Sequence, residues 1–319
     1  MRALLCAHLL PFGLLAAQEG DVDRFSDSLK IVRVNDVELH YLEKGSGVPV
    51  VLIHGGLGDY REWSAQIGPF SEHYRVVNYS RRYNYPNRNP DPDRPDHSAV
   101  VEARDLDAFL DTLKLQRVHL VGYSYGGLTA LFFATQHPER LRSLTLAEPA
   151  IMKWLPQIPG GEAELDKFMT TMWKPAGEAF RKEQPETALR ITCDYFSGKG
   201  SYDKLPAEGR RLLMSNIQEW KALTTSQDSF PMVDRDVVRR LKVRTLLITS
   251  EKTLNPMRMI IEESSRVNVS RSAGRLTICG WRSRKHVVRR RSVSWTSTSS
   301  SLARKMGSLS RRSTFEVMR

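Results

Sequence analysis

The 319-residue chain is poor in cysteine, in long apolar runs and, toward its end, in acidic residues. Three cysteines, one of them in the first ten residues, predict no disulfide framework. No apolar run is long enough to cross a bilayer, which argues against an integral membrane protein. Between Ser264 and Phe315 there is no aspartate or glutamate. The sequence therefore divides into a globular part and a final segment of different composition.

The positive charge of the chain is concentrated in that final segment, residues 264–319. This segment carries a net charge of +13, whereas the remainder carries −1, so the formal +12 does not describe the globular part. Serine and arginine make up about half of residues 264–313. We therefore expect no specific nucleic-acid partner. The composition indicates a change of reading frame near residues 263–275, and a genuine basic tail that binds polyanions is the alternative.

The first residues have the pattern of a targeting segment. Met1-Arg2 precedes an apolar stretch from Ala3 to Ala17, which is followed by polar residues. A stretch of this length is typical of a secretory signal peptide, here residues 1–18, and predicts a secreted or periplasmic protein. A fraying helix at the start of a cytoplasmic protein is the alternative.

A serine between glycines marks a candidate nucleophile. Residues 118–127 read VHLVGYSYGG, an apolar strand that continues into a GxSxG pattern centred on Ser124. A serine on a tight turn from strand to helix requires small neighbours, and Gly122 and Gly126 meet that requirement. The apolar stretch LTALFFATQ at 128–136 predicts the helix that such a turn leads into.

A second glycine-rich segment lies upstream, after the apolar strand predicted for residues 49–53. It reads HGGLG at 54–58. Small residues let a main chain approach a ligand, so the N–H groups of Gly56 and Tyr125 are candidates to stabilise an oxyanion during acyl transfer.

These two motifs and the alternation of strands and helices between them resemble the α/β-hydrolase superfamily over roughly residues 30–262. The resemblance implies an α/β fold, with a mainly parallel central sheet covered by helices on both faces. It places the core at 25–149 and 236–279 and a helical cap at 150–235. The aberrant basic tail, residues 264–319, is defined by its composition and overlaps the end of the core. It also implies a serine, an acid and a histidine at successive strand ends.

The resemblance leaves two positions for the acid. After the apolar strand at 244–249, Thr253 occupies the position where family members often carry aspartate. One strand earlier, Glu148 follows the run LTLA, as in the branches that include haloalkane dehalogenases, and it is our candidate acid. Glu251 is the alternative. The only histidine after His137 is His286, whose surroundings lack the family's glycine-histidine signature, so the base is the least supported member of the triad.

The expected pocket lies between the glycine motifs and the cap. We assign His54, Leu57, Met152 and Trp154 to it, although apolar residues at helical spacing often belong to a core instead. Arg81 and Arg82 are expected in a solvated loop, with contact to an anionic group as the alternative.

The combined prediction is a serine hydrolase of the esterase, thioesterase or lactonase type. It acts through an acyl-enzyme on Ser124, needs no cofactor or metal, and takes a small-molecule substrate with an apolar portion. The alternative is a catalytically disabled hydrolase or a binding protein, because the histidine segment is lost or replaced.

Overall fold

A computed structural model of the protein describes residues 26–90, 96–251, 253–267 and 274–278. Its centre is a sheet that has eight strands within these ranges, in the order β1-β2-β4-β3-β5-β6-β7-β8. The strands are β1 (Lys30–Val34), β2 (Val37–Lys44), β3 (Pro49–Ile53), β4 (Arg75–Tyr79), β5 (Val118–Tyr123), β6 (Leu141–Ala147), β7 (Thr245–Ser250) and β8 (Gly274–Ile278). β1 and β2 pair antiparallel with their neighbours, and every pairing from β4 through β8 is parallel. The predicted mainly parallel sheet is confirmed.

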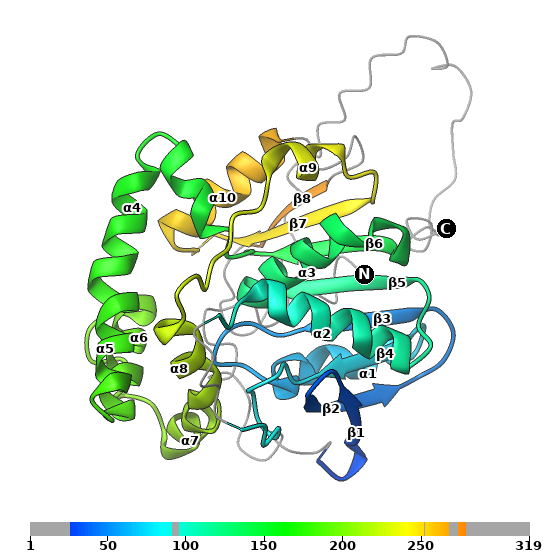
Figure 1. The fold of residues 1–319 in the computed structure, drawn as a ribbon, viewed down its shortest axis with the longest axis horizontal. Helices are drawn as coiled ribbons and strands as arrows, with labels where there is room; N and C mark the ends of the chain where they lie inside the picture. The colour runs from blue at the N-terminus through cyan, green and yellow to red at the C-terminus, as the bar shows by residue number, and fades with distance from the viewer. Residues whose placement is uncertain (1–25, 91–95, 252, 268–273, 279–319) are drawn as a thin grey trace, which may run out of the picture. The chain divides into compact units, whose positions relative to one another are not determined.

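The helices fall into two groups, one around the sheet and one inserted between β6 and β7 (Figure 1). The first comprises α1 (Ser64–Ser71), α2 (Ala99–Thr112), α3 (Ser124–Gln136), α9 (Arg235–Arg240) and α10 (Asn255–Arg266). The inserted group comprises η5 (Met152–Gln157), α4 (Gly161–Phe168), η6 (Met169–Trp173), α5 (Lys174–Arg181), α6 (Pro185–Ser197), α7 (Ala207–Ser215) and α8 (Ile217–Thr225). We call η5 to α8 the insertion.

The sheet is buried on both faces because its strands are apolar at successive positions. Side chains alternate along a strand, so Val51 and Leu120 pack on the face covered by α2 and α3. Val50 and Val121 pack on the opposite face, with Phe70 of α1. A parallel sheet covered on both faces needs such continuous apolar strands.

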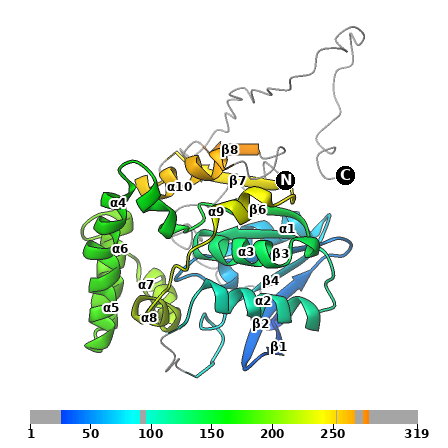
Figure 2. The same cartoon turned by 45° about the horizontal axis from the view of Figure 1, so that its top comes forward.

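The insertion lies beside the carboxyl ends of the parallel strands, where the two glycine-rich motifs also lie (Figures 1 and 2). Open α/β sheets bind ligands at this edge because the loops that leave the strands converge there. Within the described ranges, no helix has the length and apolar character that a membrane span requires.

Candidate active site

Ser124 occupies a sharp bend between β5 and α3. Its φ is +50°, in the left-handed region that residues with a side chain seldom adopt. All residues from Val118 to Ala134 are buried except Ser124, which is half-buried. The bend therefore holds the serine side chain out of the core and at the edge of a cavity.

The two glycines of the motif are required by close main-chain contacts. A Cβ atom on Gly122 would lie 2.4 Å from the carbonyl oxygen of Gly126, and one on Gly126 would lie 2.3 Å from the carbonyl oxygen of His54. Both distances are far shorter than a real contact allows. The GxSxG pattern thus follows from the steric requirements of the bend.

The loop at residues 54–58, which we call the oxyanion loop, has a distinctive pattern of N–H groups. Gly55 N–H donates to Glu62 Oε2 (2.7 Å), Leu57 N–H to Glu219 Oε2 (3.0 Å), and Gly58 N–H to Gly55 O (3.3 Å). Among the described residues no acceptor bonds Gly56 N–H, and Gly56 borders the cavity. Gly56 is also the only half-buried residue between positions 51 and 60.

Tyr125 provides the second predicted donor. It is the second residue of α3, and the first N–H groups of a helix have no partner within the helix. The α3 dipole adds positive potential at the same point. Both Gly56 and Tyr125 line the cavity together with Ser124, so the two predicted donors and the nucleophile share one space.

His54 has a structural role beneath this loop. Arg81 N–H donates to its Nε2 (2.9 Å), so the proton of the neutral ring lies on Nδ1, which donates to Gly55 O (2.9 Å). Burial and the nearby Arg81 charge lower the pKa of His54 to about 3. With both ring nitrogens engaged, the His54 side chain holds the loop and has no nitrogen left for substrate.

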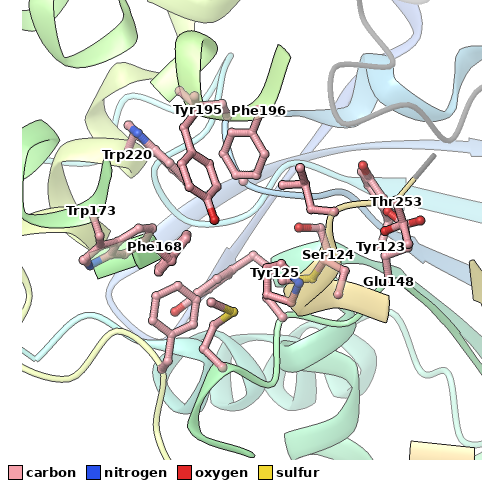
Figure 3. A pocket seen from close by; sticks show the side chains of 18 residues that line it. Tyr123, Ser124, Tyr125, Glu148, Phe168, Trp173, Tyr195, Phe196, Trp220 and Thr253 are labelled. Atoms are coloured by element: carbon pink, nitrogen blue, oxygen red, sulfur yellow. The ribbon is translucent and has the colours of Figure 1, made fainter. Parts of the chain in front are cut away.

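Glu148 lies at the end of β6, on the wall that also carries Ser124 (Figure 3). Its φ is +46°, and its Oε1 accepts the N–H of Ser250 at 2.9 Å. Burial raises the pKa of Glu148, while the Ser250 N–H and the Thr253 hydroxyl act in the opposite direction. Thr253, at the position where family members often carry the acid, also lines the cavity. The carboxylate thus lies at the cavity from the end of β6, and its role as the acid stays a prediction.

The cavity has a volume of about 70 Å³, and its two walls differ. The sheet supplies the polar groups, whereas the insertion supplies aromatic side chains that face Ser124 in Figure 3. The aromatic members from the insertion are Phe168, Trp173, Tyr195, Phe196 and Trp220. Phe230, which follows α8, also lines the cavity, as do Tyr123 and Tyr125 on either side of Ser124. Among the described residues that line it there is no histidine, lysine or arginine.

Of the four residues predicted for the pocket, two line the cavity and two do not. Leu57 and Met152 line the cavity. His54 and Trp154 are fully buried outside its wall, and the Trp154 indole N–H donates to Val233 O (2.8 Å). A fully buried tryptophan whose indole N–H is satisfied by a main-chain carbonyl is a core residue.

The expectation of a solvated loop at Arg81 and Arg82 is wrong. Both side chains are buried, because carboxylates from distant elements neutralise them. Arg81 pairs with Glu102 and Glu219, and Arg82 pairs with Asp105. These arginines are structural, and their partners were missed because no local pattern links them.

Three predictions concern parts of the chain outside the described residues. They are the signal peptide at 1–18, the base His286, and most of the basic tail at 264–319. Of the tail, the structure describes the end of α10 and the strand β8. Within the described ranges, no three His, Cys, Asp or Glu side chains are grouped so that they can hold a metal ion.

Comparison with known proteins identifies the class. Residues 48–186 match the model of a family described as having the α/β-hydrolase fold. The chain is 35% identical over 136 residues to 2-hydroxy-6-oxo-6-phenylhexa-2,4-dienoate hydrolase of Comamonas testosteroni. That match covers 41% of this chain and 46% of the relative, so the chain spans about half the length of the curated relatives it matches.

Solved structures extend the likeness to most of the chain. A thermophilic esterase from Thermogutta terrifontis is similar with a TM-score of 0.58 and 21% identity, over 78% of this chain and 90% of that one. The enol-lactonase from Burkholderia xenovorans LB400 has a TM-score of 0.53 and 20% identity, over 78% and 91%. At this identity the likeness shows the fold. Together with the family match over residues 48–186, it shows that the chain has the α/β-hydrolase fold.

Proposed function

We propose that this protein is a serine hydrolase that cleaves ester, thioester or lactone bonds through an acyl-enzyme on Ser124. One observation carries the proposal: a half-buried serine at φ +50° shares a cavity with the Gly56 and Tyr125 main chains. A strained backbone that exposes one hydroxyl beside N–H donors favours attack on a carbonyl group.

The proposed reaction has two halves. The Ser124 hydroxyl attacks the carbonyl carbon, its proton passes to a histidine base, and the oxyanion accepts hydrogen bonds from Gly56 and Tyr125. Collapse of this intermediate expels the alcohol or thiol, which takes up the proton from the histidine. Water then hydrolyses the acyl-enzyme by the same steps. Glu148 would orient the histidine, for which His286 remains the candidate.

The cavity supports a neutral substrate with a short apolar acyl group. Its volume of about 70 Å³ is smaller than the engineered cavity of about 150 Å³ that holds a benzene molecule in another protein. The Comamonas relative acts on a dienoate, which is an anion. The described lining residues of this cavity include no cation that would balance such a charge. We propose that the insertion acts as a cap whose aromatic wall selects the acyl group.

A fluorophosphonate tests the proposal because it reacts with an activated serine and requires no knowledge of the substrate. We expect one phosphonyl group per chain, mapped by peptide mass spectrometry to Ser124. We also expect turnover of p-nitrophenyl acetate and none of 2-hydroxy-6-oxo-6-phenylhexa-2,4-dienoate. An unmodified Ser124 in the folded protein would contradict the proposal and leave a non-catalytic binding protein as the function.

A further inference from the structure

A buried charge network connects the oxyanion loop to the insertion. Arg81 is 1% exposed, and its guanidinium donates to Gly55 O (2.9 Å), to Glu102 of α2, and to Glu219 of α8 (2.6 Å). Glu219 is fully buried. A buried carboxylate is stable only when its oxygens are paired, so the network holds its members in fixed positions.

Each carboxylate oxygen of Glu219 accepts a hydrogen bond from a different donor. Oε1 accepts from Arg81, and Oε2 accepts the main-chain N–H of Leu57 at 3.0 Å. Leu57 has a φ of +56°, so its backbone needs external support. The hydrogen bond that Leu57 N–H donates to Glu219 fixes the peptide between Gly56 and Leu57.

The next residue of α8 contacts the same loop on its cavity side. A Cβ atom on Gly56 would lie 2.7 Å from Trp220 Cζ3, so the indole packs directly on the Gly56 main chain. The indole N–H of Trp220 donates to Thr192 Oγ1 of α6 (2.9 Å), and this bond anchors the ring. Two consecutive residues of α8 thus constrain the oxyanion loop, one through a hydrogen bond and one through packing.

We infer that Glu219 is a positioning residue for the oxyanion hole, which holds the Gly56 N–H toward the reacting carbonyl through its bond to Leu57. This inference rests on the proposed function. Because α8 belongs to the insertion, the pair of donors at Gly56 and Tyr125 is complete only while α8 packs against the loop. The insertion then contributes to transition-state stabilisation as well as to selectivity.

Glu219→Gln tests the inference with little change of shape. Glutamine carries an NH2 group in place of one carboxylate oxygen, so either Arg81 or the Leu57 N–H faces a donor and loses its acceptor. Asp105→Asn is the matched control, because Asp105 is a buried carboxylate that accepts from Arg82 at 2.7 and 2.8 Å and bonds no residue of the oxyanion loop. The readout is phosphonylation of Ser124 by a fluorophosphonate, measured as a saturating rate and a half-saturating concentration.

We expect Glu219→Gln to lower the saturating rate at least about 10-fold and Asp105→Asn to lower it less than about 3-fold, with similar half-saturating concentrations. Glu219→Asp is the second variant. It keeps the charge but withdraws the carboxylate from Leu57, so it should also react slowly while its Tm stays near that of the wild type.

The possible outcomes separate the inference from the proposed function. A wild-type protein that is not phosphonylated at Ser124 would overturn the proposed function. A reactive wild type whose two Glu219 variants react as fast as Asp105→Asn would overturn the inference alone. Failure of both Glu219 variants to fold, while Asp105→Asn folds, would assign Glu219 to stability and would also overturn it.

Discussion

The two walls of the cavity differ in what holds them and in what they offer a ligand. The sheet wall carries the serine, the carboxylate and the two candidate N–H donors, and its backbone is strained at Ser124 and Glu148. The insertion wall is aromatic, with ring pairs such as Phe168 with Trp173 at 5.4 Å between centroids. Chemistry is therefore expected to depend on the sheet wall, and substrate preference on the insertion wall.

The difference also shows how each wall is stabilised. Strained residues persist only when their surroundings over-determine them, and here main-chain contacts at Gly122 and Gly126 do so. The aromatic wall is held by burial and ring packing, which tolerate substitution better. Glu219 connects the two walls, because it lies in the insertion and accepts a hydrogen bond from Leu57 of the oxyanion loop.

The largest effect should come from the nucleophile. Ser124→Ala removes the attacking oxygen and is expected to lower kcat/KM for p-nitrophenyl acetate by at least about 1,000-fold, with Tm little changed. Ser143→Ala, on β6 away from the cavity, is the control and should retain activity. Equal activity of the two variants would place catalysis elsewhere.

The acid should come next. Glu148→Gln keeps the shape of the side chain but removes its charge, so a histidinium formed during attack is no longer stabilised. We expect kcat to fall at least about 100-fold. Glu251→Gln tests the alternative acid and should keep most of the activity, as measured by steady-state kinetics. The reverse ranking of the two variants would show that Glu251 is the acid.

The glycine motifs were predictable from the sequence because the constraint is local. Gly122, Ser124 and Gly126 lie within five residues, and the bend that they form dictates which side chains fit. The positions of β3 and β5 then follow from their apolar composition. The same reasoning predicted that Gly56 and Tyr125 lie at one edge of the sheet, and the structure places both residues there.

The roles of His54, Arg81 and Glu219 were not predictable in the same way. Leu57 and Glu219 are 162 residues apart, and no periodic pattern pairs them. The sequence around Glu219 has mixed polarity, with Gln218 and Lys221 nearby, and gives no local signal of this role. A histidine next to two glycines resembles a ligand-binding residue, yet the N–H of Arg81 occupies its Nε2.

The insertion wall should change selectivity more than rate. Phe196 lines the cavity and is half-buried, so Phe196→Ala enlarges the acyl site at a modest cost in stability. We expect the ratio of kcat/KM for p-nitrophenyl octanoate to that for the acetate to rise about 10-fold. An unchanged ratio would mean that the aromatic wall does not contact the acyl group.

The smallest effect concerns the carboxylate that accepts Gly55 N–H. Burial raises the pKa of Glu62 to about 7, so its neutral form stabilises the fold below about pH 4.5 and that contribution is lost as the pH rises to about 7. Glu62→Gln stays neutral at every pH. Its stability relative to the wild type should therefore increase between pH 5 and pH 8 by on the order of 1 kcal/mol.

Chemical denaturation at each pH measures this difference. The exposed Glu72→Gln is the control, and its difference from the wild type should stay constant over the same interval. Parallel stability curves for Glu62→Gln and the wild type would contradict the desolvation that raises the pKa of Glu62.

The most direct test of the proposed site is a crystal structure of the protein after reaction with a fluorophosphonate. We expect a phosphonyl group on Ser124 Oγ, with its phosphoryl oxygen about 2.7–3.1 Å from the main-chain nitrogens of both Gly56 and Tyr125. A phosphoryl oxygen turned away from these two nitrogens, or a label on another residue, would contradict it.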